Sequence, residues 1–337
     1  MVGELVFSDD RVPGIARKRR GKRFSFHQPS GEAIRDPEEI ARLQAIGLPP
    51  AYQRCWYCAD PNGHIQAIGY DARGRKQYRY HPAFRADQEA GKFALCAAFG
   101  EALPTMRARV DRAMRIRSPT QERTLAAMVR LLDIGLLRIG NTCYARENGS
   151  YGVSTLRMRH VHIASRALHL SYRAKSGKQR EVLLRDAALL RFVRNMQDLP
   201  GQHLFQYLDT DGHRHQVGSS EVNAYIQETV GGNFSAKHFR TWGGTLVAFT
   251  EWRASAGAVS MKAALAAVAD ALGNTPAISR KSYIHPLVIE AIKAGPVTAR
   301  SLPGRPRATR WLSRDERALI AFLNDGNVRE SDYAPSA

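Results

Sequence analysis

The stretch GNTPAISRKSYIHP, residues 273–286, organises the interpretation of the whole chain. It begins with a Gly-Asn-Thr-Pro turn and then presents one tyrosine, Tyr283, close behind the cations Arg280 and Lys281. Cations near a tyrosine stabilise its phenolate form, which is one way to make a phenol nucleophilic. The simpler interpretation is a surface helix whose tyrosine packs its ring and leaves its hydroxyl in water. These residues alone favour the simpler interpretation. Whether Tyr283 is a nucleophile must therefore be judged from the rest of the sequence.

The composition indicates a globular and strongly basic protein. With 337 residues and 44% hydrophobic content, the chain is large enough for two or three domains with buried cores. Its formal net charge of +19 favours a polyanionic partner, because phosphate contacts supply the salt-dependent part of nucleic-acid affinity. A basic protein that is merely soluble or ribosome-associated is the alternative. No apolar run approaches the roughly 20 residues that span a bilayer, and no secretory signal precedes Arg11, so we expect an intracellular protein.

Metal and redox chemistry have little support in the sequence. Cys55 and Cys58 have the CxxC spacing, but no second CxxC or CxxH follows to complete a zinc site. His213 and His215 lie in a loop without an apparent partner cluster, and we interpret that loop as simply polar. We therefore expect reduced thiols and no metal site.

The N-terminal part has the pattern of a DNA-binding surface. Residues 1–20 end in the run Arg-Lys-Arg-Arg, which predicts a mobile, solvated arm. Asp36 followed by Pro37 predicts a capped helix within a strand-rich segment. Residues 70–82 interleave cations that reach phosphates with tyrosines that pack on sugars or bases. The alternative is a run of charged residues that is only solvated. If the segment binds DNA, the expected contacts are Tyr70, Arg73, Arg75, Lys76, Tyr78, Arg79 and Tyr80.

The segment that follows predicts helices and one unusual arginine. Helices are expected over 89–103, 104–114 and 121–135, the last with apolar residues at i, i+3, i+4 and i+7. Arg138 then lies between apolar neighbours just before a glycine turn. It must be paired or bound to an anion, because burying a lone guanidinium is costly.

Further cations follow on a hairpin and on a helix. Residues 168–173 and 180–184 alternate as two strands around a turn that holds Lys175 and Lys178. Lysines at such a tip are usually only solvated, but a hairpin tip can also carry an ammonium group into a DNA groove. A helix that starts at Ser235 would place Lys237 and Arg240 three residues apart on one face.

Four of these segments, in this order, closely resemble the active site of the type IB DNA topoisomerases, in the short form of bacteria and poxviruses. They are residues 137–141 (LRIGN), 174–178 (AKSGK), 237–243 (KHFRTWG) and 273–283, which begins with GNTP. Residues 70–80 are also similar to the N-terminal DNA-binding segment of that family. Each motif alone is weak, whereas four in order are a strong match over nearly the whole chain.

The resemblance implies an α+β fold with two domains. A small, mostly-β N-terminal domain over 21–88 would precede a larger, mainly α-helical catalytic domain over 89–295 with a small antiparallel sheet. This is the catalytic fold shared by tyrosine recombinases and type IB topoisomerases. The arm over 1–20 would precede these domains, and a basic linker and tail over 296–337 would follow, with one short helix at 314–323.

The resemblance also implies roles for the cations and the tyrosine. Tyr283 would attack the scissile phosphodiester, form a 3′-phosphotyrosyl bond and free a 5′-hydroxyl. Arg138 and Arg240 would donate to the non-bridging oxygens, where charge builds in the transition state. Lys175 would protonate the leaving 5′ oxygen, although Lys178 shares its hairpin. The DNA contacts that the resemblance implies are completed by Tyr144, Lys178 and Lys237.

One position departs from the better-known pattern of the family. Many members have histidine where this chain has Asn274, which precedes the tyrosine by nine residues. An asparagine amide donates a hydrogen bond but cannot carry charge or move protons. Activity survives if the position only donates a hydrogen bond, and it falls if the position transfers a proton. Some bacterial relatives carry asparagine here, so we expect a working enzyme.

The resemblance implies a reaction without cofactors. A phosphotyrosine conserves the energy of the cleaved bond, so religation needs no nucleotide. The sequence contains neither a GxxxxGK[ST] phosphate loop nor a carboxylate cluster suited to two metals. We expect a monomer that relaxes duplex DNA, preferably supercoiled, in the bacterial cytoplasm at the nucleoid.

Two alternatives stay open. A tyrosine recombinase shares the catalytic fold, but recombinases typically have histidine three residues before their second arginine, where this chain has Lys237. A non-catalytic DNA-binding protein would use its charge alone. It would form no covalent adduct and would be indifferent to Tyr283→Phe.

Overall fold

The computed structural model describes residues 5–21, 23–72, 74, 76–197, 199, 201–296 and 306–331. The chain divides into two compact units, Met1–Gly91 and Lys92–Ala337, close to the predicted boundary at residue 88. In the described part of the chain, no helix is both long and apolar enough to cross a membrane.

In its described residues, the first unit has a five-stranded antiparallel sheet, helix α1 and most of the helix that crosses the boundary between the units. The strand order is β2-β1-β3-β4-β5. Helix α1 is capped as predicted, because the Asp36 carboxylate accepts the N–H of Glu38 at 3.0 Å. The core contains Ile15, Phe26 and Leu43. The elements are β1 (Ile15–Arg20), β2 (Arg23–His27), α1 (Pro37–Ala45), β3 (Gln53–Tyr57), β4 (Ile65–Tyr70) and β5 (Lys76–Tyr80).

The expected mobile arm over residues 1–20 is wrong for residues 15–20, which form strand β1 inside this sheet. Ile15 is 1% exposed and belongs to the core. Arg17 donates to the carbonyls of Leu48 and Pro49 at 2.9 and 2.8 Å, and its guanidinium lies 4.4 Å from the ring centroid of Phe24. Backbone carbonyls thus hold a charge that the sequence alone assigns to solvent.

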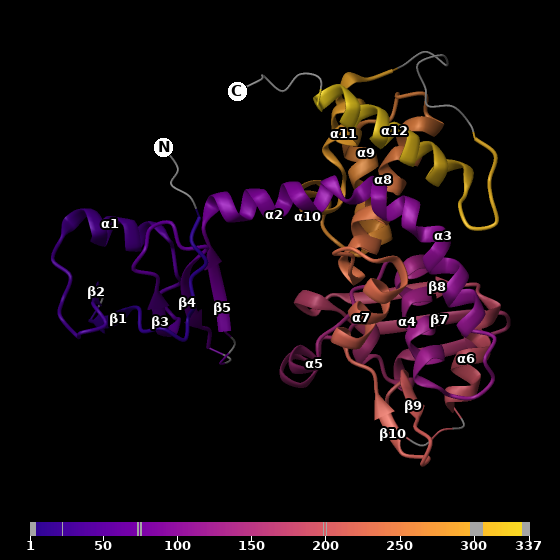
Figure 1. The fold of residues 1–337 in the computed structure, drawn as a ribbon, viewed down its shortest axis with the longest axis horizontal. Helices are drawn as coiled ribbons and strands as arrows, with labels where there is room; N and C mark the ends of the chain where they lie inside the picture. The colour runs from indigo at the N-terminus through magenta and orange to yellow at the C-terminus, as the bar shows by residue number, and fades with distance from the viewer. Residues whose placement is uncertain are drawn as a thin grey trace. The chain divides into compact units, whose positions relative to one another are not determined.

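The second unit is mainly helical and contains a three-stranded antiparallel sheet in the order β6-β7-β8 (Figure 1). This mixture confirms the α+β fold class. A 3-10 turn, Lys175–Gly177, forms the tip between β7 and β8. The boundary between the units lies within α2 (Pro82–Ala94). The described helices of the second unit are α3 (Cys96–Ala113), α4 (Gln121–Gly135), α5 (Thr142–Asn148), α6 (Ala187–Gln197), α7 (Ser219–Val230), α8 (Ala236–Ala254), α9 (Met261–Leu272), α10 (Pro276–Tyr283), α11 (Pro286–Ala294) and α12 (Arg314–Ser331). Its strands are β6 (Val161–Ala164), β7 (Ala167–Arg173), β8 (Gln179–Leu184), β9 (Gln206–Leu208) and β10 (Arg214–Gln216).

The helix boundary predicted at Pro104 is wrong. Helix α3 continues through Pro104, and the break lies earlier, at Leu95 between α2 and α3. A proline inside a helix removes one backbone hydrogen bond. Here Phe99 and Leu103 before it and Met106 after it are all at most 2% exposed, so burial of one continuous apolar face outweighs that loss. The helix predicted over 121–135 is confirmed as α4.

The predicted short helix at 314–323 is confirmed and is longer, because α12 spans Arg314–Ser331. It packs on α3 and α8, with Leu319 and Leu323 fully buried (Figure 1). Glu316 forms an ion pair with Arg107 of α3 at 2.7 Å. The described part of the segment beyond 306 is therefore part of the second unit's core and not a tail.

Candidate active site

Arg240 is a buried arginine, 4% exposed on helix α8. Its guanidinium donates to the carbonyl of Leu136 and, at 3.1 Å, to that of Leu272. Leu136 caps the C-terminal end of α4 and Leu272 is the last residue of α9, so two helix ends with partial negative charge face this cation. Burial lowers the pKa of Arg240 to about 10, and the charge of Arg138 adds to this shift, so the group is still protonated at neutral pH. Its Nε is buried without a partner in the described structure.

Arg138 lies in the loop directly after α4, and backbone hydrogen bonds hold this loop. Leu136 ends the helix with a left-handed φ of 49°. The N–H of Val153 then donates to the Arg138 carbonyl at 2.9 Å, and the N–H of Ser154 donates to the Ile139 carbonyl at 2.6 Å. The Arg138 side chain therefore extends from a fixed backbone.

Asn274 follows a tight helix end. Gly273 has a φ of 60°, which suits glycine, and the N–H of Asn274 reaches back to the Ala269 carbonyl at 2.9 Å. The Asn274 side-chain oxygen accepts a hydrogen bond from Nη2 of Arg138. Its amide nitrogen is buried and has no partner among the described residues. This side chain therefore holds Arg138 with one end and keeps a donor unused at the other.

Tyr283 is the last residue of α10, and α8 holds its backbone. The Arg240 guanidinium lies 4.8 Å from the centre of the Tyr283 ring. Gly244 permits the approach, since a Cβ there would lie 2.7 Å from the Tyr283 carbonyl oxygen. The Thr245 hydroxyl donates to that carbonyl at 3.3 Å and accepts the N–H of His285 at 3.0 Å. One helix thus sets the distance between Arg240 and Tyr283.

A cavity of about 730 Å³ lies where Arg138, Arg240 and Asn274 meet, and Tyr283 is not among the residues that line it. Its carboxylates are Glu181 and Asp270, and cations outnumber them. Such an excess of guanidinium and amide donors suits a phosphate group, because planar guanidinium donors match its oxygens. The cations and neutral side-chain donors that line it are Arg138, Tyr151, Tyr172, Lys178, Gln179, Arg180, Arg240 and Asn274.

Comparison with known proteins shows the family to which this chain belongs. Residues 81–296 match the family described as the catalytic core of eukaryotic DNA topoisomerase I, and residues 23–71 match the N-terminal domain of bacterial DNA topoisomerase IB. The chain is also 31% identical to the DNA topoisomerase 1B of Acanthamoeba polyphaga mimivirus, over 85% of this chain and 89% of the viral protein. The chain belongs to the type IB DNA topoisomerase family.

More distant proteins are similar as well. The DNA topoisomerase 1B of Vaccinia virus (strain Western Reserve) is 20% identical over 81% of this chain and 88% of its own length. A crystal structure of the XerH site-specific recombinase bound to DNA covers 57% of this chain and 50% of that chain, with 14% identity and a TM-score of 0.37. The similarity to the recombinase structure adds nothing to the type IB assignment.

Of the lysines predicted for this type IB site, only Lys178 lines the cavity. Lys175 is exposed in the 3-10 turn at the hairpin tip, and Lys237 is exposed in the first turn of α8. The structure therefore brings Arg138, Arg240 and Asn274 together in the cavity lining, and Lys175 is not part of that lining. The side chain of Tyr144 on α5 lies outside the described residues.

Two cavity residues were missed by the sequence interpretation. Tyr172 on β7 and Arg180 on β8 are direct cross-strand partners, so their side chains share one face of the hairpin. Burial raises the pKa of the Tyr172 hydroxyl, while the charges of Arg180, Arg240 and Arg138 act in the opposite direction. The alternation of Leu168, Leu170 and Tyr172 in the sequence could have predicted this, because it places Tyr172 and its cross-strand partner on the inner face of the sheet.

Apart from Tyr144, the tyrosines predicted to contact DNA lie in the first unit. Tyr78 and Tyr80 are both 40% exposed on β5, and their rings stack at 5.9 Å. Lys76 forms an ion pair with Asp10 and lies 5.3 Å from the centre of the Tyr78 ring. The Tyr70 ring is covered by Arg54, at 4.0 Å, and Arg79 donates to the Gly47 carbonyl at 3.2 Å. Arg73 and Arg75 lie outside the described residues.

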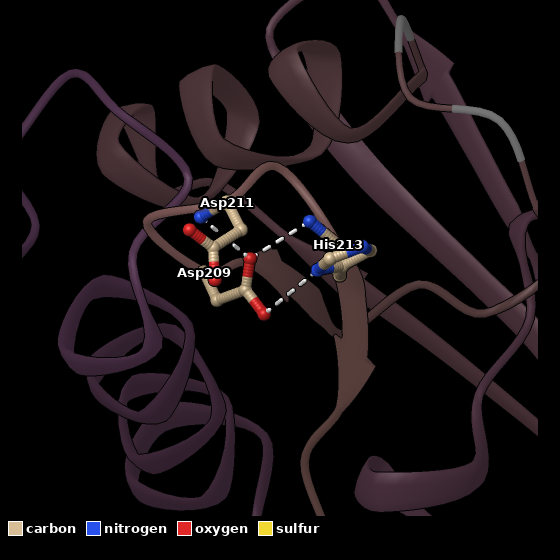
Figure 2. A group of neighbouring side chains, drawn as sticks. All are labelled: Asp209, Asp211 and His213. Carbon is tan, nitrogen blue, oxygen red and sulfur yellow. Dashed lines mark hydrogen bonds and ion pairs between the residues drawn. The ribbon is translucent and has the colours of Figure 1, made fainter.

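The loop that the sequence predicted to be simply polar contains a close group of Asp209, Asp211 and His213 (Figure 2). Asp209 accepts the N–H groups of Asp211 and His213 at 3.0 and 2.8 Å, and it lies 2.7 Å from Nε2 of His215. Its carboxylate is thus used to close the turn between β9 and β10. This exposed group is far along the chain from the cavity residues and shares none of them.

Proposed function

We propose that this chain relaxes supercoiled duplex DNA by cutting one strand with Tyr283 and then resealing it. The tyrosine oxygen attacks the scissile phosphorus, a 3′-phosphotyrosyl bond forms, and the 5′ oxygen leaves as a hydroxyl. Attack by that hydroxyl on the phosphotyrosine reverses the step. The phosphotyrosine conserves the bond energy, so the cycle needs no ATP. The arginines and a lysine are proposed to supply the charge stabilisation that a metal ion provides in other phosphoryl-transfer enzymes.

The observation that carries this proposal is the packing of Tyr283 on the buried guanidinium of Arg240, which itself lines a cationic cavity. Charge grows on the non-bridging oxygens as the phosphorus becomes five-coordinate, and preorganised donors stabilise it most strongly where water is excluded. Arg240 has an unused Nε and Asn274 an unused amide nitrogen within the described structure, and Arg138 lies beside them. These donors are proposed to bind the phosphoryl oxygens.

Protonation of the leaving 5′ oxygen is assigned to Lys175 at the hairpin tip, with Lys178 as its competitor. An alkoxide is a poor leaving group, so a positioned acid speeds this step. Lys237 is proposed to contact a neighbouring phosphate. Tyr78 and Tyr80 on β5 are proposed to contact duplex DNA together with the cations of their segment. One subunit supplies every group, so the active form is proposed to be a monomer.

The test is relaxation of supercoiled plasmid in EDTA without ATP, with the unchanged protein beside Tyr283→Phe. Phenylalanine keeps the ring that packs on Arg240, so this variant should fold and bind DNA. We expect relaxation only by the unchanged protein. On a linear, end-labelled duplex, the detergent-trapped adduct should retain a 5′ label and not a 3′ label. Relaxation by both proteins would remove Tyr283 from the chemistry. Binding by both without relaxation would leave a DNA-binding protein, and recombination between two DNA sites would indicate a recombinase.

A further inference from the structure

Arg180 lies on β8, two residues after the cavity lysine Lys178, and its guanidinium reaches across to helix α9. It donates to the carbonyls of Asp270 and Ala271 at 2.9 and 2.6 Å. These are among the last carbonyls of α9, which have no partner within the helix itself. A cation at this end is favourable, because the helix dipole places partial negative charge there.

The same side chain covers the turn that leads to Asn274. A Cβ on Gly273 would lie 2.9 Å from Cδ of Arg180, so the glycine leaves room for the arginine as well as adopting the left-handed turn. The next residue, Asn274, binds Arg138. A continuous series of contacts therefore runs from the hairpin through Arg180 and the end of α9 to Asn274 and Arg138.

We propose that Arg180 is a positioning residue: it fixes the end of α9 against the lysine hairpin and thereby aims Asn274 and Arg138 at the reacting phosphate. Both of its outer nitrogens are occupied by carbonyls, so it acts on the phosphate through its neighbours. Because it belongs to the strand that leaves the hairpin tip, it also ties the lysines to the phosphate-binding residues. This inference rests on the proposed function.

The test compares Arg180→Ala and Arg180→Lys with Arg185→Ala, which removes the same charge from an exposed site just after β8. Single-turnover cleavage is measured with excess enzyme on a 5′-labelled duplex, and the duplex dissociation constant is measured separately. We expect Arg180→Ala to cleave about tenfold to about 100-fold more slowly, since small misplacements in an active site cost this much. Lysine can satisfy one carbonyl at a time, so it should restore part of the rate. Arg185→Ala should match the unchanged protein.

A double-variant cycle with Asn274→Ala separates positioning from independent roles. If Arg180 acts through Asn274, the combined variant cleaves about as slowly as the slower single variant, because coupled residues are not additive. The inference would be overturned if the two single-variant losses in cleavage rate multiplied in the combined variant. It would also be overturned if Arg180→Ala alone changed the cleavage rate by less than about twofold. A loss confined to DNA affinity would overturn it as well. If Arg180→Ala does not fold, Arg180→Gln takes its place in the same cycle.

Amide hydrogen exchange gives a readout that needs no activity. The N–H groups of Gly273 and Asn274, bonded to Asp270 and Ala269, should exchange faster in Arg180→Ala than in Arg185→Ala. Unchanged exchange would show that Arg180 does not hold the end of α9. If the unchanged protein formed no covalent adduct, the proposed function would fail, and the exchange result would still decide this contact.

Discussion

Arg138 donates a hydrogen bond to the side-chain oxygen of Asn274, and this bond fixes the orientation of the asparagine amide. The oxygen is used by the arginine, so the nitrogen is the end that stays available as a donor. An amide can therefore serve at this position, where the family resemblance predicts histidine in many members, provided that a hydrogen bond and not a proton is required.

Replacement of Asn274 by aspartate should be more harmful than replacement by alanine. The carboxylate would form an ion pair with Arg138, remove the donor and repel the phosphate, so we expect cleavage to fall by about 100-fold or more. Asn274→His keeps a donor and should stay within about tenfold of the unchanged protein. Single-turnover cleavage of a labelled duplex measures all three. A histidine variant as slow as the aspartate variant would contradict the hydrogen-bonding role.

A substrate with a changed leaving group can show which of the two hairpin lysines, Lys175 or Lys178, acts as the general acid. Lys175→Ala should slow cleavage of a normal substrate by about 100-fold to 10,000-fold, the usual contribution of a general acid. A substrate with sulfur in place of the leaving 5′ oxygen needs no protonation, so its cleavage should be insensitive to this change. Lys178→Ala should show no such difference between the two substrates. The reverse pattern would assign the acid to Lys178, which lines the cavity.

Thr245 provides a test of how α8 holds the nucleophile. Thr245→Val keeps the shape of a fully buried side chain but leaves the Tyr283 carbonyl and the His285 N–H without their hydroxyl partner. We expect a loss of about 2 kcal/mol in unfolding free energy and slower cleavage, whereas Thr245→Ser should preserve both. Denaturant unfolding and single-turnover cleavage are the measurements. Equal behaviour of valine and serine would show that the hydroxyl is unimportant.

The ion pair between Glu316 and Arg107 should make stability depend on pH. Burial alone would raise the pKa of Glu316, but its bonds to Arg107 and Ser313 outweigh that effect and lower it below 4.5. A depressed pKa in the folded state means that the stabilisation is complete above the unfolded-state pKa and is lost as the pH falls through the folded-state value.

Glu316→Gln should therefore destabilise the protein by about 2–3 kcal/mol at pH 7, where Arg107 keeps only Asp133 as its ionic partner. The difference from the unchanged protein should shrink as the pH falls below 4.5, the ordinary value for a glutamate. Denaturant unfolding at a series of pH values measures it. A difference that does not change with pH would contradict the assigned ionisation of Glu316.

Patterns within a single segment predicted their structures well. The apolar spacing of 121–135 predicted α4 at its observed bounds, and Asp36 predicted the start of α1. Arg138 was recognised as an arginine that needs a partner, and the structure supplies Asn274.

Features that depend on partners distant in the sequence were not predicted. The strand Ile15–Arg20 looked like a solvated arm, because nothing near Arg17 in the sequence shows that carbonyls of residues 48 and 49 accept its hydrogen bonds. Arg180 was missed for the same reason, since its partners, the carbonyls at the end of α9, leave no mark in the amino-acid sequence. The helix break expected at Pro104 failed because burial on both sides of the proline outweighs one lost hydrogen bond.

The late position of α12 has a consequence for the chain while it is being made. The ribosome releases the chain from its N-terminus, so Arg138, Arg240 and Tyr283 all emerge before Leu319 and Leu323, which cover an apolar face on α3 and α8. Until those leucines arrive, the helix that carries Arg240 lacks one wall of its core. We expect the ability to cut DNA to appear only after α12 has left the ribosome. Products of interrupted translation should then be degraded as incompletely packed proteins instead of acting as nicking enzymes on the genome.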